Sequence, residues 1–267
     1  MTRHGNRGLR LYTTLYLAFL YLPVLLLPIF SFNDSIYVAL PIKGLTLQWW
    51  SEMAAQTGMH TALANSLVVA VPVAFASTSL GLVAVLALFG RERLPGAPLV
   101  TGLFTLPLVV PYIILGIALL ILFNRSGIGL SLFSVGFGHT LICTPFALFV
   151  LMSRFEGLDP SLAEAALDLG ETPWMAFWRV TFPIVLPGVM ASLLLTFTIS
   201  FDEFLLAFFL TGNDSTLPLY IFSQLRFPAK LPAVLALGSA ILLATFAIVI
   251  VAERLRRRGL GSTGNTD

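Results

Sequence analysis

The run Glu164-Ala165-Ala166, followed by Gly170 and then by Val180-Thr181-Phe182-Pro183, forms a polar island in an otherwise apolar chain. The flanking residues predict its local structure. Asp159 is a good N-cap and Pro160 suits the first position of a helix. Gly170 stands where a helix ends in a left-handed C-cap. The sequence therefore predicts a short helix over residues 160–169.

A second start signal follows at once. Thr172 is an N-cap candidate and Pro173 again suits a first helical position, so a second helix is expected to run toward Pro183. The island as a whole, residues 154–183, predicts a helix-turn-helix at the membrane surface.

The first of these two helices has a face suited to a partner. Leu162, Ala165, Ala166 and Leu169 share one face at helical spacing, with Glu164 and Asp168 offset from it. Alanine on an exposed face allows close approach of a partner, and the acidic excess of the island indicates a basic groove on that partner. An amphipathic helix lying at the headgroups is the alternative, but such helices are usually rich in Lys and Arg on their polar face.

The composition around the island places the chain in a bilayer. Hydrophobic residues make up 57% of the 267 residues and charged residues 10%, and the mean hydropathy is +0.92. This leaves too little polar surface to cover a soluble globule. A spanning helix needs about 20 mostly apolar residues. Six stretches meet this requirement, near residues 11–32, 62–90, 99–123, 130–152, 184–210 and 231–252. We expect an all-α membrane protein, a six-transmembrane-helix bundle forming a single domain over 1–267 with its core at about 60–252.

The distribution of basic residues predicts the orientation, because Lys and Arg near membrane ends stay on the cytoplasmic side. With six spans both termini share one side. That side would carry Arg3, Arg7, Arg10, Arg91, Arg93, Arg154, Arg179, Arg254, Arg256, Arg257 and Arg258, against Lys43, Arg125, Arg226 and Lys230 on the other. We therefore expect cytoplasmic termini and an uncleaved first span. The net charge of +2 is explained by this topology and does not call for nucleic acid.

Two aromatic or proline-rich segments carry further expectations. Trp49-Trp50, in the first outer connection, are interpreted as interfacial anchors. Pro107 and Pro111 should bend or break the third span. Such a break either lines a cavity or is a simple packing kink.

The pair Asp202-Glu203 is the most costly feature of the fifth span. Counted from Pro187, Asp202 lies roughly 22 Å along the helix, past the bilayer centre on the outer side. A lipid-facing carboxylate there costs roughly 2.5 to 3.5 kcal/mol, so both must face protein or water. Adjacent helical residues point about 100° apart, so one carboxylate should face a transport path while the other bonds to a neighbouring helix. The sequence leaves open which one does which.

Aromatic residues and a histidine surround this pair. Phe197, Phe201, Phe204 and Phe208 recur at helical spacing and would either offer cation-π contacts or pack against lipid and helices. His139, in the fourth span, is interpreted as a hydrogen-bond partner between helices rather than a ligand.

Catalytic and cofactor motifs are missing from the sequence. It has no Gly-x-x-x-x-Gly-Lys-Ser/Thr loop, no Cys/His cluster at metal spacing and no Gly-x-Ser-x-Gly elbow. The single cysteine, Cys143, excludes an internal disulfide. We expect a chain that is not an enzyme and holds no cofactor of its own.

The spacing of the island resembles the signature loop of permease subunits of ATP-binding-cassette (ABC) importers, which reads Glu-Ala-Ala, three residues, Gly, nine residues, Ile-x-Leu-Pro. Glu164, Ala165, Ala166, Gly170 and Pro183 match by identity, and Val180 and Phe182 replace Ile and Leu. The resemblance implies a type I ABC importer permease fold. It also implies that the helix at 160–169, Asp168 included, is the coupling helix that sits in a groove of a nucleotide-binding subunit, where ATP and Mg would be held.

Other segments resemble the second permease of spermidine/putrescine importers. These are Ser31-Phe32-Asn33-Asp34-Ser35, Ala64-Asn65-Ser66-Leu67, Leu106-Pro107-Leu108-Val109-Val110-Pro111 and Leu217-Pro218-Leu219-Tyr220. Ser200-Phe201-Asp202-Glu203-Phe204 is similar to an acidic pair that usually reads Asp-Asp in that group. The resemblance implies a substrate path at Ser200, Phe201, Asp202 and Glu203.

By the same resemblance, the chain would be a subunit of an importer in a bacterial inner membrane. Its partners would be two nucleotide-binding ATPase subunits, a second permease that is a different chain, a periplasmic solute-binding protein and membrane lipid. The solute would be a polyamine or another small organic cation, moved inward by alternating access. The alternatives are an ABC permease for another solute, such as an amino-acid derivative, a phosphonate or a metal, and an ATP-independent secondary transporter.

Overall fold

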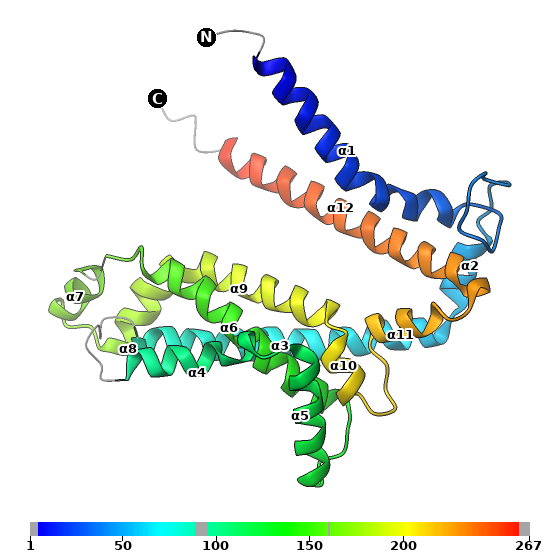
Figure 1. Cartoon of the computed structure of the whole chain (residues 1–267). Coiled ribbons are helices and arrows are strands. Elements are labelled where there is room, and N and C mark those ends of the chain that lie inside the picture. The colour runs from blue at the N-terminus through cyan, green and yellow to red at the C-terminus, as the bar shows by residue number, and fades with distance from the viewer. Residues whose placement is uncertain (1–4, 89–95, 160, 262–267) are drawn as a thin grey trace. The chain divides into compact units, whose positions relative to one another are not determined.

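The computed structural model describes residues 5–88, 96–159 and 161–261 (Figure 1). Pro160, expected to open the coupling helix, and Arg3, Arg91 and Arg93, used for the orientation, lie outside the described residues.

Helices make up almost all of the described chain. In order they are α1 (Gly5–Ser31), α2 (Gln48–Ala55), α3 (Thr57–Leu88), α4 (Ala97–Val109), α5 (Tyr112–Arg125), α6 (Leu132–Phe155), α7 (Ser161–Asp168), α8 (Pro173–Ala176), the π-helical turn η1 (Phe177–Thr181), α9 (Phe182–Asp202), α10 (Leu205–Leu210), α11 (Leu217–Gln224), the 3₁₀ turn η2 (Pro228–Lys230) and α12 (Leu231–Gly261).

The described helices confirm an all-α membrane fold. Five of them are long and apolar enough to span a bilayer, and α4 with α5 makes a sixth if that bent pair is counted as one span. The bend between α4 and α5 is 101°. It falls at Val110, which is extended (φ −80°, ψ 126°), as expected for a residue that precedes proline. The prediction of a break at Pro107 and Pro111 is confirmed.

The chain divides into two compact units, one from residues up to 57 together with those from 221 on, the other from residues 58–220. In the first unit α1 and α2 both pack on α12. The connection after α1 is fixed by Asn33, whose carbonyl accepts the Trp49 indole N–H at 2.8 Å and whose Oδ1 accepts the Lys43 N–H at 3.0 Å. Trp49 is only 5% exposed. The interfacial interpretation of Trp49 is therefore wrong, because the side chain is used to hold this loop.

The second unit is a bundle in which α6 packs along α9 and also contacts α4, α5 and α10. The α3–α6 crossing is very close: a Cβ placed on Gly81 would lie 3.0 Å from Ala147 Cβ and 3.0 Å from the Leu148 nitrogen. Between α3, α4 and α6 lies an apolar cavity of about 900 Å³, with Pro107 and Val110 in its wall. The broken span therefore borders a cavity. Of the two alternatives expected for this break, lining a cavity and a simple packing kink, the structure favours the first.

The fifth span differs from the expected single helix over 184–210. Its helix begins earlier, since α8, η1 and α9 run on from Pro173 to Asp202, and it ends at Asp202, after which α10 starts anew at Leu205. Figure 1 shows α7 at one end of this bundle and α10 at the other. The loop around α7 and the acidic pair thus lie at opposite ends of the second unit.

Candidate functional site

The start of the helix α7 is capped as its sequence predicts. Asp159 Oδ1 accepts the Ser161 backbone N–H at 3.0 Å. Hydrogen bonds from the Ser161 side chain and backbone hold the pKa of Asp159 below its ordinary value, because they stabilise the charged carboxylate.

The end of α7 is a Schellman motif. Gly170 adopts φ +89°, its N–H donates to the Leu167 carbonyl at 2.9 Å, and the Glu171 N–H donates to the Ala166 carbonyl at 3.1 Å. Both helix boundaries predicted from Asp159 and Gly170 are therefore confirmed to within a residue.

The surface of α7 is mostly exposed. Leu162, Ala165 and Leu169 are exposed as predicted, Leu169 by 87%. Ala166 was expected on the same face but is 8% exposed, because α7 packs on α8 and η1. Glu164 and Asp168 are exposed beside this face. The helix therefore presents leucines and two carboxylates, with Ala166 as its inward contact.

The segment after α7 leads directly into the fifth span. Thr172 Oγ1 accepts the Met175 N–H at 3.3 Å, which confirms the second start signal. The helix then widens into the π turn η1, where the Phe182 N–H bonds to the Phe177 carbonyl. Pro183 explains the wide turn, since proline has no N–H and its ring clashes with the carbonyl four residues earlier, that of Arg179. The expected surface helix and the fifth span are thus one continuous helical run.

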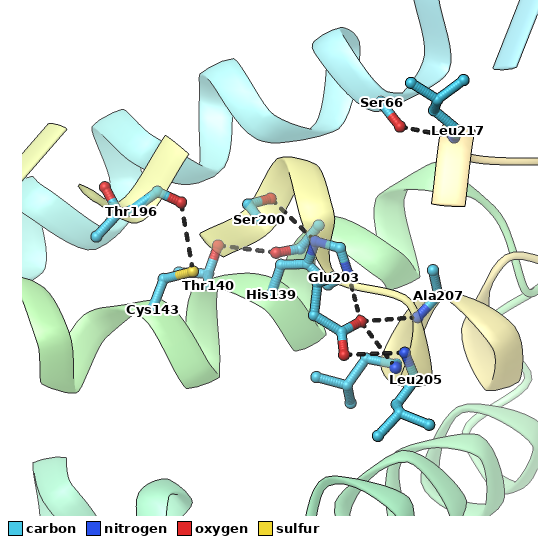
Figure 2. A network of polar contacts seen from close by, with 12 residues as sticks. Ser66, His139, Thr140, Cys143, Thr196, Ser200, Glu203, Leu205, Ala207 and Leu217 are labelled. Atoms are coloured by element: carbon cyan, nitrogen blue, oxygen red, sulfur yellow. Dashed lines mark hydrogen bonds and ion pairs between the residues drawn. The ribbon is translucent and has the colours of Figure 1, made fainter. Parts of the chain in front are cut away.

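The acidic pair at the other end of the bundle is divided by the structure. Glu203 is extended (φ −72°, ψ 122°) and its carboxylate turns onto the first turn of α10 (Figure 2). Oε1 accepts the Leu205 N–H at 2.9 Å, while Oε2 accepts the N–H groups of Leu206 at 2.8 Å and Ala207 at 3.3 Å. A carboxylate at this position satisfies the donors that a new helix leaves without partners. This explains why the fifth span breaks here without proline or glycine.

His139 of α6 joins the same network. Its Nε2 lies 3.2 Å from Glu203 Oε2, and its Nδ1 lies 2.9 Å from Ser200 Oγ. His139, Ser200 and Glu203 are all buried, and Figure 2 shows them converging between α6 and α9. The interpretation of His139 as a hydrogen-bond partner between helices is confirmed. Sequence reasoning did not connect it with Glu203.

Asp202 lies on the surface at the end of α9. Within the part of the chain that the structure describes, no hydrogen bond or ion pair to its carboxylate is recorded. The expected phenylalanine stripe is split by the helix break into two pairs, Phe197 with Phe201 at 5.7 Å and Phe204 with Phe208 at 5.8 Å between ring centroids.

Two further segments singled out in the sequence meet in the fold. Asn65 Nδ2 donates to the Ser215 carbonyl at 3.0 Å, and Ser66 Oγ accepts the Leu217 N–H at 2.8 Å. These contacts fasten α3 to the start of α11. Among the described residues, no group of three or more His, Cys, Asp or Glu side chains is arranged to hold a metal ion.

The described residues form an all-helical membrane protein with five or six candidate spans and a capped loop around α7. Residues 87–259 match the family described as binding-protein-dependent transport system inner membrane component. The chain belongs to this family: it is a multi-pass inner-membrane permease subunit of an ABC importer. It is not itself catalytic, and nucleotide binding lies on partner subunits.

Among curated proteins, the chain is 33% identical over 255 residues to the spermidine/putrescine transport system permease protein PotC of Escherichia coli strain K12, covering 95% of each chain. It is 35% identical over 249 residues to the putrescine transport system permease protein PotI of the same strain, covering 90% of this chain and 87% of PotI. The molybdenum transport system permease protein ModB of Haemophilus influenzae is 33% identical over 158 residues, 53% of this chain and 69% of ModB.

A solved structure shares the fold. The crystal structure of a bacterial ABC transporter involved in the import of the acidic polysaccharide alginate contains a chain that matches with a TM-score of 0.67, 15% identity, and coverage of 96% of this chain and 98% of that one. This likeness supports the fold alone.

Proposed function

We propose that this permease moves a polyamine, such as putrescine or spermidine, or a similar small organic cation. The observation that carries the proposal is the Asp202 carboxylate, exposed at the end of α9 that lies away from α7. A carboxylate at this depth attracts a cation, and the half-buried ring of Phe201 is its neighbour in the chain. The likeness to PotC and PotI over most of the chain supports the same solute class.

We place the termini and α7 in the cytoplasm, on the strength of the basic residues that flank the spans. A permease of this family works with ATPase and binding-protein partners. We propose a complex with two ATPase subunits, a second permease of different sequence and a periplasmic binding protein. The solute would enter a path between the two permeases that contains Phe201 and Asp202. Ser200 and Glu203, which were expected on the same path, are buried.

We propose that α7 is the coupling helix. Its exposed leucines would enter an apolar part of the ATPase groove, and Glu164 and Asp168 would meet basic residues on the rim. Ala165 permits close approach, Ala166 fixes α7 to α8, and Gly170 and Pro183 set the geometry at either end of the connection. Closure of the ATPase dimer would move α7 and, through the continuous helix from Pro173 to Asp202, the outer end of α9.

The test of the solute is uptake by the complete transporter in proteoliposomes, with labelled putrescine, spermidine and molybdate. Asp202→Asn should raise the putrescine concentration for half-maximal uptake by at least about tenfold, since one charge contact is worth about 1.5–3 kcal/mol. Asp214→Asn, on the exposed segment before α11, is the matched control and should have little effect. Failure of the wild-type transporter to take up putrescine and spermidine would refute the proposed solute, and an unchanged half-saturation in Asp202→Asn would remove Asp202 from its recognition.

A permease for another solute is the second candidate, and the match to ModB over about half of the chain favours an oxyanion in that case. The cognate binding protein separates the two candidates, because a bound ligand raises its thermal stability by mass action. Stabilisation by putrescine or spermidine supports the cation. Stabilisation by molybdate alone would leave the importer in place and remove Asp202 from solute recognition.

A further inference from the structure

Glu203 is the member of the acidic pair that the fold encloses. Its side chain is 6% exposed. Three backbone N–H groups of α10 donate to it, and His139 Nε2 lies 3.2 Å from Oε2. An ionised carboxylate has about four lone-pair sites. Three backbone N–H donors therefore take up most of the hydrogen-bonding capacity of Glu203, and all three come from the chain itself.

The imidazole of His139 joins three helices at one point. The imidazole Nε2 lies 3.2 Å from Glu203 Oε2, and Nδ1 forms a hydrogen bond of 2.9 Å with Ser200 Oγ. Ser200 is near the end of α9, Glu203 precedes α10 and His139 belongs to α6. A single buried side chain therefore sets the position of both sides of the break (Figure 2).

The break in turn determines where Asp202 lies. In an uninterrupted helix the N–H groups of Leu205, Leu206 and Ala207 would bond to the carbonyls four residues earlier. Here the Glu203 side chain takes over that role. Asp202 consequently becomes the last residue of α9, with its carboxylate exposed.

We propose that Glu203 is a positioning residue and not a solute ligand. With His139 it holds the break between α9 and α10, so that Asp202 alone of the pair presents its carboxylate to the transport path. The functional part of this inference rests on the cation transport proposed above. Its geometric part, that Asp202 is accessible and Glu203 is enclosed, can be tested without any solute.

Thiol accessibility is the direct test, since the chain's single cysteine, Cys143, is fully buried. Asp202→Cys and Glu203→Cys would be made separately in the full chain, and the complete transporter in lipid nanodiscs treated with a cationic methanethiosulfonate. The rate of modification of this subunit is followed by mass spectrometry, with the unsubstituted chain as background. Asp202→Cys should react at least about tenfold faster than Glu203→Cys, because reaction requires an accessible thiolate. Equal rates would overturn the proposal.

Transport kinetics provide a second test if Glu203→Cys fails to assemble. Glu203→Gln offers one acceptor oxygen to three N–H groups, so it should lower the maximal rate while the putrescine concentration for half-maximal uptake stays within about twofold. Glu203→Asp keeps the charge and should recover most of the rate. His139→Asn should resemble Glu203→Gln, and the double variant should be no worse than either alone, since the two residues act as one unit. A shift in half-saturation by Glu203→Gln as large as that by Asp202→Asn would overturn the assignment.

The two proposals fail in different ways. If Asp202→Cys reacts faster than Glu203→Cys but the wild-type transporter takes up neither putrescine nor spermidine, the proposed solute is wrong and the positioning role of Glu203 stands. If amines protect both variants equally, both carboxylates contact solute and the positioning role is refuted.

Discussion

Replacing Gly170 by alanine should uncouple ATP hydrolysis from transport. Gly170 has φ +89° and nothing within 4 Å of the position of an added Cβ. Alanine would therefore destabilise the C-cap only through its backbone conformation and not through a steric clash. A left-handed conformation costs an L-residue about 1–2 kcal/mol. That is a factor of about 5–30 in the population of the native C-cap. Asparagine tolerates this region better, so Gly170→Asn should be milder than Gly170→Ala.

Gly127 provides a matched control. It has φ +71°, also with nothing within 4 Å of the position of an added Cβ, but it follows α5 and is remote in sequence from α7. Gly127→Ala should lower the thermal midpoint of the purified transporter about as much as Gly170→Ala does. The assay is ATP hydrolysis and solute uptake by the same proteoliposomes, with and without binding protein. Only Gly170→Ala should lower the ratio of uptake to ATP hydrolysed; equal ratios for the two variants would refute the reasoning.

Three further changes have expected outcomes. Gly81→Ala should lower the free energy of unfolding by about 1–3 kcal/mol, because the added methyl group overpacks against the backbone of α6. Gly102→Ala is the control: nothing lies within 4 Å of the added Cβ, so the gain in helix propensity should stabilise the chain. A thermal midpoint for Gly81→Ala as high as that for Gly102→Ala would contradict the close crossing. Thr172→Ala should destabilise the start of α8 by about 1 kcal/mol, because it removes the N-cap. The binding of purified ATPase subunit to the permease should weaken for Thr172→Ala and be retained by the conservative control Thr172→Ser. Since the pKa of Asp159 is lowered in the folded chain, its stabilisation of α7 is present above the ordinary aspartate pKa and is lost as pH falls through the lowered value. ATPase binding should therefore weaken over that acidic range more steeply for wild type than for Asp159→Asn, which keeps Glu164 and Asp168.

The features that the sequence predicted well are those determined by neighbouring residues. The bounds of α7 depend on Asp159 and on Gly170, and both act within one turn of the helix. The bend between α4 and α5 follows from a proline that constrains the residue before it. Local chemistry of this kind can be read without knowing the rest of the fold.

The features that the sequence could not predict depend on distant partners. The break after Asp202 has no proline or glycine to announce it, and the carboxylate of Glu203 that caps α10 packs beside His139, which is 64 residues away in the sequence. The burial of Trp49 likewise depends on the carbonyl of Asn33. A Glu-Phe-Leu-Leu sequence is compatible with a continuous helix, so only the tertiary contact decides. One local hint existed: an acidic residue suits the start of a new helix.

The helical run from Pro173 to Asp202 has a mechanical consequence. Its 30 residues measure roughly 45 Å at 1.5 Å per residue, with α7 packed at one end and the His139–Glu203 joint at the other. In such a lever, a tilt of about 5° at the α7 end displaces the far end by roughly 4 Å over that length. That displacement exceeds the 3.2 Å separation of His139 Nε2 from Glu203 Oε2. A small rotation at one end of this helical run is therefore enough to make or break the contact between His139 and Glu203 at the other end.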